Sequence, residues 1–147
     1  MYSKILVPLD GSERAEAILP CVRELAGRLS AELVLVRVIE PQPHITAPGE
    51  PVPYAPVADI NELTVAAEAY LAGLKDQLGQ QGLRVRVLVP YGPVVDEIIA
   101  AADQEEADLI AIASHGRGGL ARLFYGSVAS ALLQRVSQPL LLVRSRD

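Results

Sequence analysis

Residues 108–136 read DLIAIASHGRGGLARLFYGSVASALLQRV. An almost wholly apolar run, 108–113, comes first, and a glycine-rich stretch separates it from a segment in which Val128, Leu132 and Val136 recur at helical spacing. This succession is typical of a buried strand, a loop and a helix in an α/β protein. The loop therefore follows the carboxyl end of a strand, where open α/β sheets bind their ligands.

The same alternation of short apolar runs and helical segments extends along the whole chain. The runs rich in Val, Ile and Leu are residues 4–9, 32–39, 84–89, 108–113 and 139–144. Such runs are typical of parallel strands that are covered on both faces. The sequence therefore predicts an α/β fold, a doubly wound five-stranded parallel sheet with helices on both faces.

Two strand orders are compatible with this pattern, 2-1-3-4-5 and 3-2-1-4-5. The second order places the first and fourth strands side by side. The turn PLDGS, residues 8–12, would then meet the glycine-rich loop at one edge of the sheet. We favour 3-2-1-4-5 because it brings these two loops together.

Prolines and capping residues indicate where the helices begin. Pro20 lies inside the first helical segment and predicts a kink or a late start, because proline removes a helical hydrogen bond. Asp59, with Glu62 three residues on, is expected to open the longest helix. Its predicted buried stripe is Leu63, Ala67, Tyr70, Leu71, Leu74 and Leu78. Pro93 is expected at the first position of the helix after the third strand.

Length and composition indicate one domain, residues 1–147, because 147 residues that are 50% apolar suffice for a single full core. A proline-rich loop is expected over 40–58, and residues 40–56 hold six of the eleven prolines. Two interpretations of this loop stay open, a surface flap near a site or a disordered insertion.

Charge and cysteine content narrow the function classes. A net charge of −5 argues against nucleic acid as a partner, and no segment has the length of a membrane span. One cysteine suits a reducing compartment, so we expect a cytoplasmic protein. The two histidines and one cysteine are too scattered for a zinc site, and no metal ligands are predicted.

The glycine-rich loop has the composition of a phosphate cradle. Gly116 leaves backbone amides uncovered, and Gly126 and Ser127 begin a helix whose amides and dipole favour an anion. No Asp or Glu occurs from Leu109 to Arg146, and Arg117 can add positive charge. The alternative is that the glycines serve turns and that Ser127 merely caps the last helix. Neither the GxxxxGK[ST] nor the GxGxxG fingerprint is present.

The stretches ILVPLDGSERAEAILP, LVRVIEP and ADLIAIASHGRGGLARLFYGSVASALLQRVSQPLLLVR resemble the universal stress protein family over the whole chain. The nucleotide-binding branch of that family carries G-x2-G-x9-G-[S/T]. Gly116, Gly126 and Ser127 match this motif, and Ala113 stands where its first glycine would be. The resemblance implies an ATP-binding fold, with Mg²⁺ accompanying the ATP, the order 3-2-1-4-5 and a homodimer.

The resemblance also implies roles for individual residues near the base and the sugar. Pro8 and Asp10 would lie at the ribose, with Asp10 accepting hydrogen bonds from the sugar hydroxyls. Val38 would lie at the adenine. From the residues alone, Asp10 could equally be a turn or capping residue and Val38 a core residue of a strand.

For the rest of the nucleotide, the resemblance implies two groups of contacts. Ile112 and Ala113 would pack beneath it. The phosphates would be held mainly by backbone amides of the loop and the helix that follows, at Gly116, Gly126, Ser127 and Val128.

Three classes of function remain: an enzyme, a binding module and a nucleotide-free structural protein. No catalytic residue is predicted, because no base is evident beside the terminal phosphate, so at most slow ATP hydrolysis is expected. We favour an ATP-binding stress-response protein that acts as a nucleotide-dependent switch on an unidentified protein partner. The apolar edge strand 139–144 predicts a homodimer through that strand.

Overall fold

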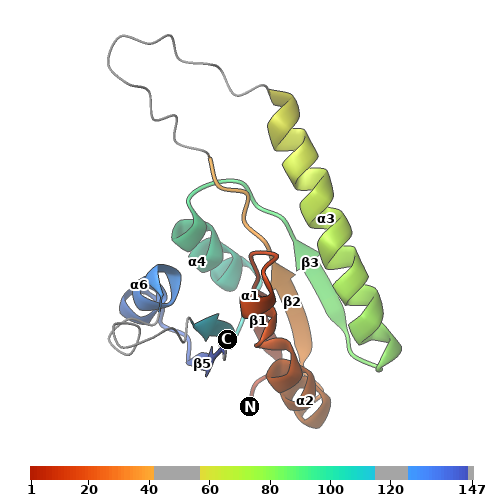
Figure 1. Ribbon diagram of the computed structural model, residues 1–147. Helices are drawn as coiled ribbons and strands as arrows, with labels where there is room; N and C mark the ends of the chain where they lie inside the picture. The colour runs from red at the N-terminus through yellow and green to blue at the C-terminus, as the bar shows by residue number, and fades with distance from the viewer. Residues whose placement is uncertain (42–56, 115–125, 146–147) are drawn as a thin grey trace, which may run out of the picture.

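The computed structural model describes residues 1–41, 57–114 and 126–145, with the backbone alone given for residues 57–59. Strands and helices alternate along the chain, as Figure 1 shows. The strands are β1 (Lys4–Pro8), β2 (Glu32–Val36), β3 (Val85–Leu88), β4 (Leu109–Ser114) and β5 (Leu140–Arg144). The helices are α1 (Glu13–Glu16), α2 (Leu19–Leu29), α3 (Val57–Gln80), α4 (Val94–Gln104) and α6 (Ser127–Arg135).

The five strands form one parallel sheet in the order β3-β2-β1-β4-β5. The predicted order 3-2-1-4-5 is confirmed, and the alternative 2-1-3-4-5 is wrong. β1 lies at the centre, with Ile5 opposite Leu109 and Leu6 opposite Ile110 on β4. The carboxyl ends of β1, β2 and β4 therefore lie next to one another.

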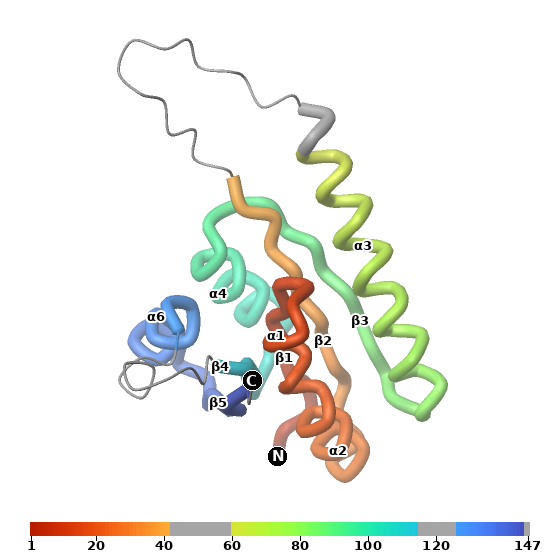
Figure 2. Tube along the Cα trace, in the orientation of Figure 1, coloured from red at the N-terminus to blue at the C-terminus, as the bar shows by residue number. Residues whose placement is uncertain are grey.

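Helices cover both faces of this sheet, as predicted. Alternate residues of each strand point to opposite faces, so Ile5 and Val7 enter one core cluster and Leu6 enters the other. The first cluster includes buried side chains of α2 and α3, and the second includes those of α4 and α6. Figure 2 shows α4 and α6 together on one side of the sheet and α3 on the other.

β1, β2, β3 and β5 are shorter than the apolar runs that predicted them, and β4 has the predicted length but lies one residue later in the sequence. β2 ends at Val36, so Val38 lies beyond the strand rather than within it, and its side chain is only half-buried. The interpretation of Val38 as a strand core residue is therefore wrong.

The structure resolves the choice that Pro20 left open. A short helix, α1, is capped by Ser12 and ends at Glu16, and α2 begins separately at Leu19 with Pro20 in its first turn. The missing amide of Pro20 costs nothing there, because first-turn amides have no helical acceptor. The helix therefore starts late and has no kink at Pro20.

The prediction for Pro93 is wrong by one position. Pro93 is the N-cap of α4, directly before the first helical residue, Val94.

The longest helix differs from its prediction at its amino end. α3 begins at Val57, so Asp59 lies inside the helix and does not open it. Leu63, placed in the buried stripe, is 43% exposed, whereas Leu71 is fully buried. The physical reason is length: 24 residues extend about 36 Å. The four residues of β3 are much shorter, and Figure 1 shows the first turns of α3 extending past the sheet.

The amino edge of the sheet is held by a carboxylate. Asp108, just before β4, accepts hydrogen bonds from the amide of Ser3 (2.8 Å), the hydroxyl of Ser3 (2.8 Å) and the amide of Lys4 (3.1 Å). Partial burial acts to raise the pKa of Asp108, but these hydrogen bonds outweigh it and hold the pKa below its usual value. The central strands are thus tied together at the edge opposite the carboxyl ends.

Within the described ranges, every helix falls short of the length or the apolar character that a bilayer crossing demands.

Two leucines of α3 test the overhang of this helix. Leu71→Ala is expected to lower the free energy of unfolding by about 2–5 kcal/mol, because it leaves a cavity in the core. Leu63→Ala, a matched control on the same helix, should change it by less than about 0.5 kcal/mol. Urea denaturation followed by circular dichroism measures both, and equal losses would contradict the placement of Leu63 outside the core.

Candidate functional site

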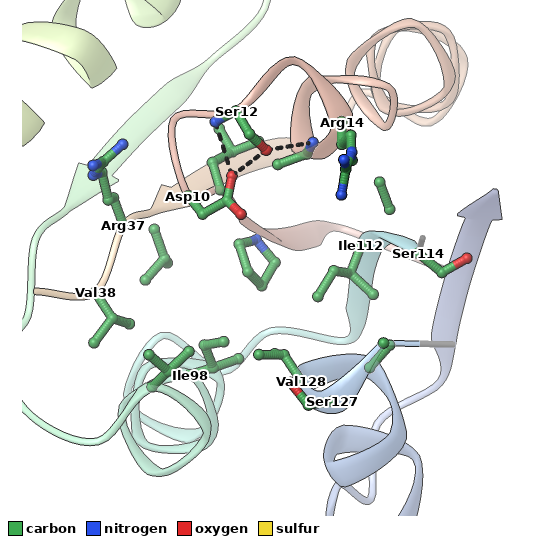
Figure 3. Close-up of a pocket in the computed structure, with 18 of the residues that line it drawn as sticks. Asp10, Ser12, Arg14, Arg37, Val38, Ile98, Ile112, Ser114, Ser127 and Val128 are labelled. Atoms are coloured by element: carbon green, nitrogen blue, oxygen red, sulfur yellow. Dashed lines mark hydrogen bonds between the residues drawn. The ribbon is translucent and has the colours of Figure 1, made fainter. Parts of the chain in front are cut away.

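A cavity of about 250 Å³ opens at the carboxyl ends of β1, β2 and β4. Its walls come from the turn after β1, the segment after β2, the start of α4 and the start of α6 (Figure 3). Of the predicted site residues, those that line it are Pro8, Asp10, Val38, Ile112, Ala113, Gly126, Ser127 and Val128. Gly116 and Arg117 lie outside the described residues. Eight positions spread over 121 residues of sequence therefore meet in one cavity.

One part of the cavity wall is apolar. Val36 and Val38 contribute from β2 and the segment after it, and the start of α4 contributes Val94 and Ile98. Ile112 of β4 completes this surface, and Figure 3 shows Val38, Ile98 and Ile112 around the same space. Such a surface suits a flat apolar group, because its burial needs no hydrogen-bond partner.

Asp10 organises the turn between β1 and α1. Its Oδ1 atom accepts hydrogen bonds from the amide of Ser12 (2.8 Å) and from the Ser12 hydroxyl. The Ser12 Oγ atom in turn accepts from the amide of Ala15 (3.2 Å), which caps α1. The interpretation of Asp10 as a turn residue thus accounts for one carboxylate oxygen. Figure 3 shows the other oxygen on the cavity side of the turn, where it can accept from a ligand.

The charge of Asp10 is secured by the same contacts. Partial burial acts to raise its pKa, but the hydrogen bonds from Ser12 and the nearby positive charge of Arg37 hold the pKa below its usual value. Asp10 is therefore a carboxylate at neutral pH. Its stabilising effect is present above the pKa of the unfolded chain and is lost as the pH falls through the lower folded value.

Arg37 follows β2 and lines the cavity, although the sequence analysis did not single it out. Its guanidinium lies 5.7 Å from the ring centroid of Tyr70 on α3, within the range of a cation–π contact. It also packs against Gly11, where a Cβ atom would lie 1.8 Å from Nη1. Gly11 has φ +85, which favours glycine. The turn of Asp10 and the long helix are therefore linked through one arginine.

Tyr70 packs against the core with the charged side chains of Glu16 and Arg37 nearby. Burial, followed by the nearby carboxylate of Glu16, raises the pKa of Tyr70. The phenol is therefore neutral over the physiological range and presents a ring face to Arg37.

The start of α6 presents uncovered amides to the cavity. Gly126 is the N-cap, with φ 88, and none of the described side chains caps this helix. The first helical hydrogen bond runs from the amide of Ser130 to the carbonyl of Gly126 (3.0 Å). The amides of Ser127, Val128 and Ala129 precede it and have no acceptor within the helix. The suggestion that Ser127 caps α6 is wrong, because Ser127 is the first helical residue and its side chain makes no capping bond.

Ala113, the departure from the family motif, lies within β4. It pairs in register with Val143 of β5 and has an ordinary extended backbone. Its side chain packs against the core cluster on the face covered by α2 and α3. The position therefore needs no glycine for its backbone conformation.

Polar lining residues beyond the predicted set come from the turn and from strand ends. They are Ser12, Arg14, Arg37, Glu40 and Ser114. Both arginines are close in sequence to predicted site residues, since Arg14 is four residues after Asp10 and Arg37 directly precedes Val38. This proximity is the sequence signal that could have indicated them. Across the described ranges, no three His, Cys, Asp or Glu side chains gather in a way that would hold a metal ion.

Comparison with known proteins places this chain in a family. The model of the universal stress protein family matches residues 1–144. The universal stress protein MJ0577 of Methanocaldococcus jannaschii is 27% identical over 158 residues, covering 100% of this chain and 98% of that protein. The chain belongs to the universal stress protein family.

Solved structures agree with this assignment. The MJ0577 structure superposes with a TM-score of 0.78 at 27% identity, covering 100% of this chain and 99% of that one. A universal stress protein in complex with cAMP has a TM-score of 0.70 at 23% identity, covering 99% and 98%. The universal stress protein from Archaeoglobus fulgidus in complex with dAMP has a TM-score of 0.62 at 20% identity, covering 96% and 97%. The last two share the fold with this chain.

Two substitutions at Asp10 separate its turn contacts from the contact with a nucleotide that the family resemblance implies. Asp10→Ala removes both oxygens, so we expect a loss of about 1 kcal/mol in the free energy of unfolding together with a loss of nucleotide affinity. Asp10→Asn keeps an acceptor for Ser12, so stability should hold while nucleotide affinity falls by about 1–3 kcal/mol. Thermal unfolding and titration calorimetry measure the two quantities, and unchanged affinity in Asp10→Asn would leave Asp10 a turn residue only.

Proposed function

We propose that this chain binds an adenine nucleotide, with ATP as the preferred ligand, and acts as a nucleotide-dependent binding protein. The observation that carries the proposal is the single cavity that joins an apolar wall, a carboxylate oxygen and the uncapped start of α6. These three features match the base, the sugar hydroxyls and the phosphates of a nucleotide. Complexes of two family members with cAMP and dAMP support the nucleotide class.

The placement of the ligand follows from these features. The adenine would pack against Val38 and Ile112, and the sugar hydroxyls would donate to Asp10. The phosphates would accept hydrogen bonds from the amides of Ser127 and Val128 at the positive end of the α6 dipole. Mg²⁺ would arrive bound to the phosphates, since it is commonly held by substrate phosphates and water.

Binding rather than turnover is the role we assign. The described residues around the start of α6 that line the cavity carry no carboxylate or imidazole that could act as a base beside the phosphates. Hydrolysis would therefore be slow. The bound nucleotide would act by favouring one shape of the protein, which an unidentified protein partner then recognises.

Titration with ATP tests this function. We expect the parent chain to bind ATP with Mg²⁺ and its melting temperature to rise with ATP concentration, because a ligand that binds only the folded state stabilises it. Ala113→Gly should bind ATP equally well or more tightly, while losing about 0.5–1 kcal/mol of stability because glycine weakens a strand. Calorimetry and thermal unfolding measure both effects.

Two outcomes of that titration would contradict the proposal. If neither the parent nor Ala113→Gly binds ATP, the chain works as a nucleotide-free protein. If only Ala113→Gly binds, the methyl group of Ala113 closes the site in the natural chain.

We further propose that the protein is a homodimer joined through residues 139–144. Among the described strands, β5 lies at the edge of the sheet and pairs with β4 alone, and it carries the half-buried apolar side chains Leu140, Leu141, Leu142 and Val143. An apolar edge of this kind is a template for the same strand of a second copy.

One charged substitution tests the dimer. Leu141→Lys should convert the dimer to a folded monomer at micromolar concentration, because burying an ammonium group between two strands is costly. Multi-angle light scattering measures the mass, and circular dichroism confirms folding. A parent chain that is already monomeric at this concentration would contradict the proposed dimer.

A further inference from the structure

One side chain connects the cavity to the longest helix. Arg37 lines the cavity, and Figure 3 shows it on the same side of Asp10 as Val38. Its guanidinium lies 5.7 Å from the ring centroid of Tyr70 on α3. Both side chains are half-buried, and a cation–π contact gains strength as the charge is removed from water. Tyr70 does not line the cavity, so a ligand there would reach α3 only through Arg37.

The same guanidinium packs against the turn after β1. It occupies the space beside Gly11 in which a side chain would otherwise lie, and the φ of +85 at Gly11 favours glycine. Gly11 stands between Asp10 and Ser12, whose hydrogen bonds to the Asp10 Oδ1 atom shape the turn. The positive charge of Arg37 also attracts the Asp10 carboxylate. A change in the position of Arg37 would therefore alter both the packing and the charge around Asp10.

The backbone on either side of this contact is fixed by hydrogen bonds. The amide of Leu9 donates to the carbonyl of Val36 (2.8 Å), which joins the residues that follow β1 to the end of β2. The amide of Arg37 donates to the carbonyl of Leu88 on β3 (3.1 Å). The base of the Arg37 side chain is thus held by the sheet. What remains adjustable is the guanidinium, which the contacts with the turn and with α3 restrict.

We propose that Arg37 is a positioning residue that couples α3 to the Asp10 turn, so that nucleotide binding and the packing of Tyr70 on α3 stabilise each other. This inference rests on the proposed function and adds a means of regulation to it. Such coupling is reciprocal: a nucleotide that holds Asp10 in place secures α3, and a change in α3 alters the affinity for the nucleotide. α3 is accordingly an element through which a protein partner can recognise the bound state.

ATP affinity in a double-mutant cycle tests this coupling. The variants are Tyr70→Leu, which keeps an apolar side chain and removes the ring, Arg37→Gln, which removes the charge, and the two together. Calorimetry with Mg²⁺ measures the affinity, well below the melting temperature of every variant. The matched control is Leu74→Ala, which shortens a buried core side chain of α3 that does not line the cavity.

We expect Tyr70→Leu to weaken ATP binding about three- to tenfold, the scale of one cation–π contact. In the Arg37→Gln background the same change should add less than about a twofold loss, because the contact is already broken. Tyr70→Phe should recover most of the affinity, since it keeps the ring. Leu74→Ala should lower the melting temperature and leave the ATP affinity as in the parent.

Hydrogen exchange measures the coupling in the opposite direction. Saturating ATP should slow the exchange of the α3 amides around Tyr70 in the parent chain, because the bound turn restricts Arg37 and Arg37 restricts the ring. In Tyr70→Leu, also saturated with ATP, this slowing should be smaller. Equal slowing in the two chains would contradict the coupling.

The affinities can overturn the inference in distinguishable ways. Parent-like ATP affinity in Tyr70→Leu, or the same loss with and without the Arg37 charge, shows that Tyr70 does not act through Arg37, while the proposed function stands. An equal loss in Leu74→Ala shows that affinity merely follows the stability of the fold. A parent chain that binds no ATP overturns the proposed function and this inference together.

Discussion

The parallel pairing of β1 with β4 is the contact on which the rest of this molecule depends. It sets Ile5 opposite Leu109 and Leu6 opposite Ile110 at the centre of the sheet. Because the two strands run in the same direction, the turn after β1 and the carboxyl end of β4 lie at the same edge of the sheet. This pairing is what brings Asp10, after β1, and Ser127, at the start of α6, to the same cavity. The site is thus a product of strand order.

The fold could be predicted because strands that are buried on both faces of a sheet appear in the sequence as nearly continuous apolar runs. Strands such as β1 are apolar almost throughout, as is typical of a parallel sheet with helices on both faces. The strand order also followed from the sequence, since only one of the two common orders brought the two candidate loops together. Local periodicity failed for Leu63 because exposure there depends on how far α3 outreaches the sheet, which is a tertiary property.

The candidate site was predictable only in part. The resemblance to the family identified Asp10, Val38 and Ser127 by their motifs, and the fold brings them to one cavity. Arg14 and Arg37 were not identified, because arginines on a helix or after a strand are common on any surface. Their significance comes from geometry: Arg37 contacts Tyr70 and Gly11, and Arg14 is carried on a helix that Asp10 helps to hold. Such contacts have no signature in sequence spacing.

The hydrogen bonds of Asp108 stabilise one end of the sheet, and the cavity lies at the other end. At the amino end, one carboxylate joins the start of β1 to the start of β4 through three hydrogen bonds, none of which involves a residue of the cavity. The framework is thus secured at a place remote from the cavity. Substitutions in the cavity lining leave these three hydrogen bonds in place, so the lining can change while the pairing of β1 with β4 is kept.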